Sequence, residues 1–155
     1  MPRWLIAYLL VFPNLALCFF GGNSYFCTML FDNDFLKQLL QRAADSERLR
    51  MNYDLRTTPA DGSQRMFNAM MPGTEVPVHR HDDTAETVVC LTGRVDEVIY
   101  ERGDDGQLRE TSRMQLCPAE GRYACQIPRG VWHTVEVKEP TVIFEAKDGA
   151  FKPRQ

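Results

Sequence analysis

Three histidines are the most informative residues of this chain, because the chain contains no others. His79 and His81 are separated by one residue, and Glu86 follows five residues after His81. Side chains alternate along an extended strand, so the two histidines can project from one face of it. The acidic loop after His81 lets the chain turn and bring Glu86 back to the same centre. His133 follows a Pro-x-Gly turn that leads into another predicted strand.

We interpret His79, His81, Glu86 and His133 as the ligands of one metal ion. Imidazole and carboxylate ligands suit Fe, Mn, Ni, Cu or Zn, and they do not form a calcium-type cage of oxygens. Four protein ligands leave two positions open at an octahedral metal for water, substrate or dioxygen, whereas a tetrahedral zinc would have none. The sequence therefore predicts one divalent transition metal ion and leaves its identity open.

The spacing of these residues resembles the first motif of the cupin superfamily. That motif runs Gly, five residues, His-x-His, three or four residues, Glu, six residues and Gly, and Gly73 and Gly93 complete it here. The resemblance implies a cupin fold, which is a jelly-roll-like β-barrel that holds a metal inside. It also implies pairing of two copies through their sheets, so we expect a homodimer.

The second cupin motif is matched in part. Pro128 and Gly130 precede His133 at the motif's spacing, but Gly121 lies one residue too far upstream and the terminal Asn of the motif is Val137. These departures leave the ligand set intact.

More narrowly, the chain resembles the WbuC family of small cupin-fold metalloproteins, often encoded near bacterial surface-polysaccharide genes. The segments that carry this resemblance are 48–52, 64–69, 79–81 and 142–147, within residues 31–153. The resemblance implies that Arg50 and Asn52 edge a ligand pocket, although an arginine on an alternating strand is more often simply solvated. It also implies a small polar ligand of the sugar or sugar-acid type.

Secondary-structure patterns support a mainly β fold with an N-terminal α-helix. A helix is expected from Asp32 or Asn33, because both are good N-caps and an apolar stripe with helical spacing follows. Short alternating or apolar runs then predict strands at 48–53, 64–71, 86–91, 95–100, 108–116, 123–127, 131–137 and 141–146. Many short strands after one helix predict a barrel or a sandwich, and the cupin resemblance selects the barrel.

Composition limits the classes of partner. A chain of 155 residues with ordinary globular composition predicts one folded domain. The formal net charge of −3 argues against a nucleic-acid binder, and no Lys/Arg run suggests a stable membrane association. The five cysteines are odd in number and form no CxxC pair, so we interpret those in the strands as small buried hydrophobes. Reduced thiols favour a cytoplasmic location.

Residues 1–28 differ from the predicted cupin domain, residues 29–155. This extension is strongly apolar but too short, and too interrupted by Pro13 and Asn14, for a transmembrane helix. We favour a native start at Met29; the alternative is a signal sequence, in which case the protein is exported.

Two classes of function remain open. The first is a metal-dependent enzyme, an isomerase, lyase or dioxygenase, that acts on a small polar molecule. The second is a non-catalytic module that binds a metal and a saccharide or metabolite. The sequence identifies no catalytic residue, because no second titratable group stands out as a general base.

Overall fold

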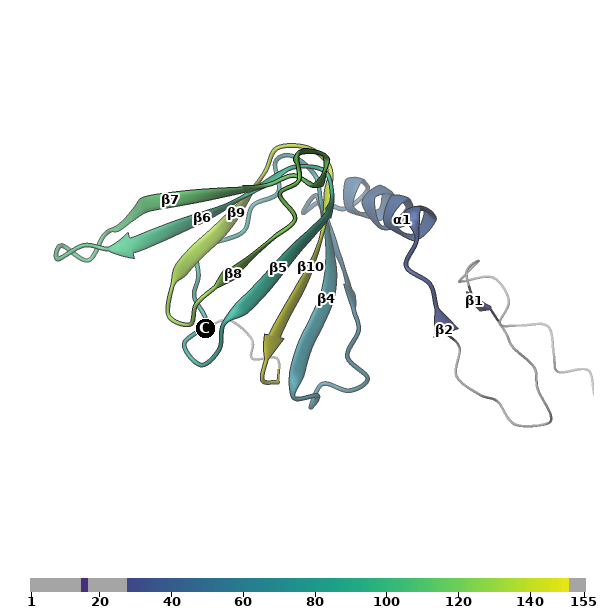
Figure 1. Ribbon diagram of the computed structural model, residues 1–155, viewed down its shortest axis with the longest axis horizontal. Helices are drawn as coiled ribbons and strands as arrows, with labels where there is room; N and C mark the ends of the chain where they lie inside the picture. The colour runs from purple at the N-terminus through teal and green to yellow at the C-terminus, as the bar shows by residue number, and fades with distance from the viewer. Residues whose placement is uncertain (1–14, 17–27, 151–155) are drawn as a thin grey trace, which may run out of the picture. The chain divides into compact units, whose positions relative to one another are not determined.

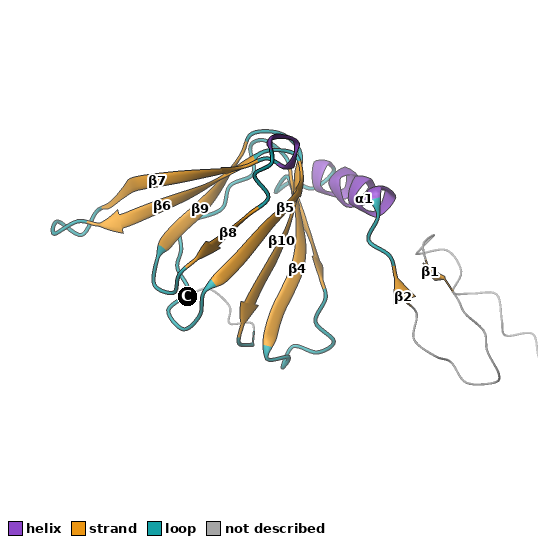
Figure 2. Ribbon diagram, viewed as in Figure 1, coloured by secondary structure: helices purple, strands orange, loops and turns teal. Residues whose placement is uncertain are grey.

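The computed structural model describes residues 15–16 and 28–150, in which antiparallel strands predominate (Figures 1 and 2). The helices are α1 (Asn33–Ala44) and the short 3-10 helix η1 (Pro118–Glu120). In chain order the strands are β1 (Leu15–Ala16), β2 (Thr28–Met29), β3 (Arg50–Asp54), β4 (Ser63–Met70), β5 (Glu86–Thr92), β6 (Val95–Arg102), β7 (Leu108–Leu116), β8 (Ala124–Ile127), β9 (Trp132–Val137) and β10 (Thr141–Asp148).

The hydrogen-bonded strands form two main sheets, and the predicted mainly β fold with an N-terminal helix is confirmed. A five-stranded sheet has the order β3-β4-β10-β5-β8, and a three-stranded sheet has the order β7-β6-β9 (Figure 1). The two ladders are not joined into a closed barrel within the described residues, so the architecture is jelly-roll-like. Between β4 and β5 the chain makes only an isolated bridge, His79 with His133. Pro72 and Pro77 in this segment carry no amide hydrogen, which limits the pairing it can make.

We call the face of each main sheet that contributes to the central hydrophobic cluster its inner face. Directly paired residues of neighbouring strands project to the same side, and side chains alternate along each strand. The cluster at the centre draws on both sheets and contains Met70, Val88, Cys90, Val95, Leu116, Ile127 and Ile143. Val131 and Val135 pack against this cluster, as expected if His133 points inward. The described cysteines, Cys90, Cys117 and Cys125, are free thiols.

Helix α1 begins at the predicted cap. The Asp32 carboxylate accepts hydrogen bonds from the amides of Asp34 and Phe35, at 3.1 and 3.0 Å, which satisfies two amides that have no partner within the helix. Leu39 and Ala43, one helical turn apart, are almost fully buried. The apolar stripe is therefore a packing face.

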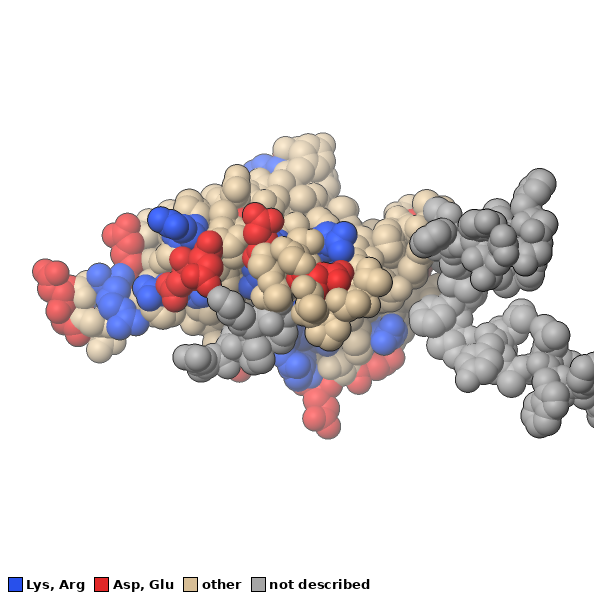
Figure 3. All heavy atoms as spheres, turned by 90° about the horizontal axis from the view of Figure 1, so that it is seen from below, with Lys and Arg blue, Asp and Glu red and all other residues tan. Residues whose placement is uncertain are grey.

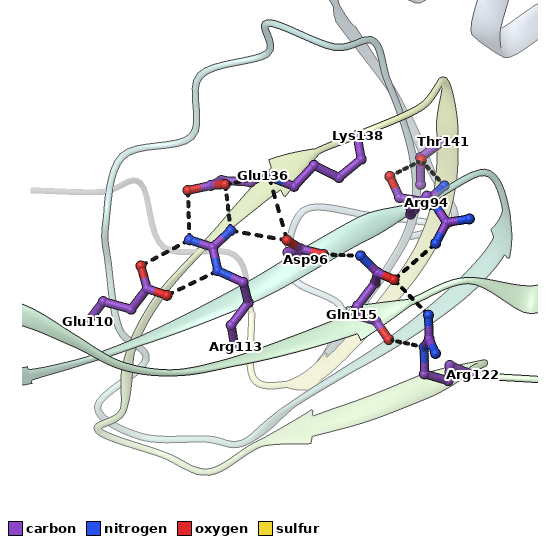
Figure 4. Close-up of polar contacts among 9 residues, drawn as sticks. All are labelled: Arg94, Asp96, Glu110, Arg113, Gln115, Arg122, Glu136, Lys138 and Thr141. Atoms are coloured by element: carbon purple, nitrogen blue, oxygen red, sulfur yellow. Dashed lines mark hydrogen bonds and ion pairs between the residues drawn. The ribbon is translucent and has the colours of Figure 1, made fainter. Parts of the chain in front are cut away.

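The outer face of the three-stranded sheet is held by charged side chains (Figure 4). Arg113 on β7 reaches Glu110 on its own strand, Glu136 on β9 and Asp96 on β6; its distance to Asp96 is 3.0 Å. Gln115 also donates to Asp96, at 3.1 Å. Asp96 is nearly buried, yet each of its oxygens has a partner, so its charge is compensated.

The N-terminal part of the chain belongs to a compact unit of its own. Two compact units meet between Lys37 and Gln38, and β1 pairs with β2 through Leu15 opposite Met29. Most of the predicted extension, residues 1–28, lies outside the described residues, and its independence from the cupin domain stays a prediction.

No helix among residues 15–16 and 28–150 is both long and apolar enough to cross a membrane. On the face that Figure 3 shows, acidic and basic side chains lie next to one another, and neither sign forms a continuous field.

Gly93, the last glycine of the first motif, is required at the turn between β5 and β6. Its φ is +84°, in the left-handed region that side chains disfavour. A Cβ there would lie 2.2 Å from the Pro140 carbonyl oxygen and 2.5 Å from Thr141 Oγ1. The motif glycine therefore permits close approach of the loop before β10.

We expect Gly93→Ala to destabilise the fold more than Gly106→Ala. Gly106 has a similar φ of +77°, but a Cβ there would meet nothing within 4 Å. The control should lose about 1–2 kcal/mol, the cost of left-handed backbone alone. Urea denaturation of both variants measures the difference; equal losses would show that the close approach contributes nothing.

Candidate metal centre

The four predicted ligands come together in the structure. His79, His81, Glu86 and His133 each offer a ligand atom, and these atoms lie within 4.8 Å of one another. Glu86 Oε2 is 3.1 Å from His133 Nε2 and 3.3 Å from His81 Nε2. Glu86 and His133 are only 6% and 2% exposed, so the centre is largely shielded from water.

Backbone pairing brings the distant histidines together. The amide of His79 donates to the His133 carbonyl at 2.9 Å, and the amide of His133 donates back at 2.8 Å. The Gly130 amide donates to the His81 carbonyl at 2.7 Å. The segment with the first two histidines is thus fixed to the start of β9, and Glu86 enters from the first residue of β5.

Two of the three imidazoles are oriented by backbone carbonyls. His79 Nδ1 lies 3.0 Å from the Pro77 oxygen, and His133 Nδ1 lies 3.0 Å from the Val131 oxygen. A carbonyl only accepts, so both Nδ1 atoms carry hydrogen and donate. In the neutral ring this leaves the lone pair on Nε2, which is the arrangement of a metal-bound histidine with an outer-shell partner.

His81 is held differently. Its Nδ1 lies 3.1 Å from the Nζ of Lys147 on β10, and its buried Nε2 makes no hydrogen bond of good geometry. A charged ammonium can only donate, so in the neutral ring the proton then sits on Nε2. A metal bound through Nε2 would replace that proton. The ring is within reach of the centre, and its buried Nε2 is an atom that a metal would satisfy.

Electrostatics favour an ionised carboxylate at the centre. Burial would raise the pKa of Glu86, but hydrogen bonds from the Nε2 atoms of His133 and His81, when these carry a proton, hold the pKa well below its usual value of 4.5. An ionised Glu86 beside three imidazole nitrogens is a donor set that suits a transition metal. The residues present therefore fit the predicted ion.

The residues between the ligands form an outer clamp. Arg80, which separates the first two histidines, places its guanidinium 4.9 Å from the centre of the Trp132 ring, and Arg102 lies 5.1 Å from the same ring. Such contacts are worth about 0.5–1 kcal/mol each at exposed sites. The Arg80 contact ties together the two segments that carry His81 and His133, and the Arg102 contact ties β6 to β9.

Arg50 and Asn52 share the inner face of the five-stranded sheet. Arg50 pairs with Met70 and Asn52 with Asn68 across β3 and β4, and Met70 belongs to the central cluster. Arg50 is half-buried and Asn52 is exposed. Their role toward a ligand stays a prediction.

The sequence reasoning missed Glu97. It lies on β6 opposite Val135 and is 1% exposed, and neither carboxyl oxygen has a hydrogen-bond partner. Burial, then the charges of Glu145 and Glu86, raise its pKa well above 4.5. The same interior raises the pKa of the Cys125 thiol to about 12. Glu97 is therefore a second titratable group inside the fold, contrary to the earlier expectation.

The available signal was the strand's period of two. Val95 and Ile99 share a side with Glu97, so an inward Val95 implies an inward glutamate. The neighbouring acid, Asp96, could equally have been the inward one on sequence alone.

Comparison with known proteins places the chain in a family. The family described as "Domain of unknown function (DUF6016)" matches residues 31–114, which is more than half of the chain. The chain belongs to this family. The match covers three of the four candidate ligands, His79, His81 and Glu86. No curated protein matches the sequence.

Solved structures show the fold. Oxalate oxidase in complex with the substrate analogue glycolate aligns with a TM-score of 0.52 at 16% identity, over 72% of this chain and 56% of that one. A conserved protein of unknown function from Streptococcus pyogenes, SPY1581, aligns with a TM-score of 0.51 at 11% identity, over 71% and 86%. CapF with a tropolone inhibitor aligns with a TM-score of 0.50 at 19% identity, over 66% and 29%. Oxalate oxidase and CapF are cupin-fold proteins, and their likeness to the present chain shows that it shares this fold.

We expect Glu97→Gln to stabilise the protein at neutral pH. The folded pKa of Glu97 is raised, so its favourable contribution is complete below about pH 4.5 and is lost as pH rises toward the folded pKa. The difference in unfolding free energy, variant minus wild type, should therefore be small in acid and grow with pH. Urea denaturation across pH measures it.

The matched control is Glu101→Gln, an exposed glutamate on the same strand. Its difference from wild type should stay flat with pH. A flat difference for Glu97→Gln as well would mean that Glu97 is not neutral in the fold.

Proposed function

We propose that this protein is a cupin metalloprotein that binds one divalent transition metal through His79, His81, Glu86 and His133. The supporting observation is the buried cluster itself, in which three imidazoles and an ionised carboxylate converge within 4.8 Å. Fe, Mn, Ni, Cu and Zn all accept such ligands, and none of the residues selects among them.

We further propose that it is an enzyme acting on a small polar molecule of the sugar or sugar-acid type. When bound, the metal would supply Lewis-acid polarisation of a substrate oxygen, within a dry interior that strengthens it. The chain supplies positive groups on the same inner face, Lys147 beside His81 and Arg50 on β3. These favour an anionic or hydroxyl-rich substrate.

The link to bacterial surface-polysaccharide biosynthesis rests on the resemblance to the WbuC family. The expected homodimer rests on the cupin resemblance, and the cytoplasmic location rests on the free thiols. Oxalate oxidase, described with bound glycolate, illustrates a small carboxylate in a related fold. Isomerisation, elimination and dioxygen insertion all remain compatible reactions. A metal-loaded protein that binds metabolites without turning any over would favour the non-catalytic module instead.

Metal binding is tested by His133→Ala. We expect this variant to lose most of its metal, because His133 lies on a separate strand from the other three ligands. Metal at a thousandfold above its dissociation constant stabilises a fold by about 4 kcal/mol, so the melting temperature should fall as well. Metal analysis of purified protein and thermal unfolding measure both effects.

The control for His133→Ala is wild type after chelation. If the lost stability comes from the metal, chelated wild type and the variant should melt at similar temperatures. A folded His133→Ala protein with full metal occupancy would exclude this four-ligand centre.

Ligand recognition is tested by Arg50→Ala. A charge-assisted hydrogen bond is worth about 1.5–3 kcal/mol, so this variant should bind an anionic metabolite found by screening at least about tenfold more weakly. Metal content and folding should be unchanged. Arg48→Ala serves as control, because Arg48 is exposed and precedes β3; equal affinity in both variants would leave Arg50 without a role in binding.

A further inference from the structure

The position of Glu97 places an acid inside the fold, close to the metal ligands along the strand ladder. In the pairing of β6 with β9, Ile99 lies opposite His133 and Glu97 lies opposite Val135. Glu97 is therefore the inward-facing residue of β6 next to Ile99, which pairs with the candidate ligand His133. Both of its oxygens are buried and lack hydrogen-bond partners.

Another polar atom of the interior also lacks a partner. Gln64 is 6% exposed, and its Oε1 makes no hydrogen bond. Gln64 lies opposite Lys147, the residue that reaches His81. Buried polar atoms in folded proteins nearly always have a partner. Unpartnered atoms on the inner faces of both sheets therefore point to a polar molecule that binds between them.

The charges of the interior indicate the sign of that molecule. A divalent metal and Lys147 would contribute three positive charges, whereas Glu86 and Glu145 contribute two negative ones if ionised. Glu97 adds none, since its burial raises its pKa well above the usual range. The remaining positive charge is matched by a small anion.

A neutral carboxyl suits an anion better than an ionised one would. A carboxylic acid has one O–H donor, whereas a carboxylate only accepts and would repel an anion. Asp96 provides the contrast, because Arg113 and Gln115 compensate it on the outer face, and Glu97 has no such group. The inner glutamate is therefore suited to donate a hydrogen bond.

We propose that the Glu97 carboxyl donates a hydrogen bond to a small carboxylate anion held at the metal centre. This inference rests on the proposed metal-binding function, and it names the ligand class and a contacting residue of that site. The contact would satisfy the orphaned carboxyl of Glu97. It would also give the site a preference for ligands with an acceptor oxygen beyond the one that meets the metal.

The test uses the full chain loaded with Co²⁺ and acetate as the probe. Acetate affinity is read from the visible spectrum of the cobalt, and metal content is measured separately. Glu97→Leu removes the donor and should weaken acetate binding at least about tenfold, which corresponds to about 1.4 kcal/mol. Glu97→Gln keeps an N–H donor and should stay near wild type. Glu101→Leu on the exposed part of β6 is the matched control and should not change affinity.

Infrared spectroscopy tests the contact in the wild-type protein, and Glu97→Gln serves only to assign the band. Wild type should show the C=O band of a protonated carboxyl, the band should be missing in Glu97→Gln, and acetate should shift it to lower frequency only when cobalt is present. Unchanged acetate affinity in Glu97→Leu overturns the inference, as does a band that acetate does not move. Wild type that takes up cobalt but no acetate overturns it too. Wild type that takes up no metal overturns the proposed function itself, and the inference with it.

Discussion

The reciprocal pair of backbone hydrogen bonds between His79 and His133 is the constraint on which the site depends. The segment from Pro72 to Ala85 has no strand of its own, and this bridge is what fixes it to β9. Because the two residues exchange both amide-to-carbonyl bonds, their side chains emerge on the same side. The bridge thereby sets the orientation of two imidazoles at once. It also joins the segment between β4 and β5, two strands of the five-stranded sheet, to β9 of the three-stranded sheet. The two sheets share the central hydrophobic cluster.

The convergence of His79, His81 and Glu86 could be predicted because it depends on short-range regularities, whereas His133 was assigned from the Pro-x-Gly turn of the second motif. Two histidines separated by one residue share a face in any extended backbone, and the motif glycine Gly93 marks the turn after β5. The helix start at Asp32 was readable for a similar reason, since capping involves only neighbouring residues.

Which acid of β6 faces the core could not be predicted, because Asp96 and Glu97 are adjacent in the sequence. Asp96 and Glu97 face opposite sides of the strand, and only the pairing with β7 and β9 decides which one is buried with the core. The separation into two sheets was equally out of reach. It depends on which strands exchange hydrogen bonds across long stretches of chain, and cupin motif spacing does not specify that.

The interior contains unpaired polar atoms that lower the stability of the fold. An unpaired buried polar group costs about 1–3 kcal/mol, a sizeable part of the 5–15 kcal/mol that holds a typical domain together. Glu97 and Gln64 each carry such atoms, whereas Asp96 on the outer face is matched by Arg113 and Gln115. Val or Leu at position 97 would continue the apolar inner surface of Val95 and Val135 and avoid the cost. A carboxyl in that place makes sense only if something polar meets it in the working protein.

The alternation of side chains along an extended chain links the candidate metal ligands to the outer clamp of Arg80 and Trp132. Arg80 lies between the two ligands His79 and His81, and Trp132 precedes the ligand His133, so the outward neighbours of the ligands are the residues that stack on one another. A shift of one residue in either segment would therefore turn the imidazoles outward and the stacked pair inward together. Both outcomes are unfavourable, since a guanidinium would then lie in the core and the imidazoles would leave the centre. The outer clamp thus specifies the register of the metal centre without touching a ligand atom.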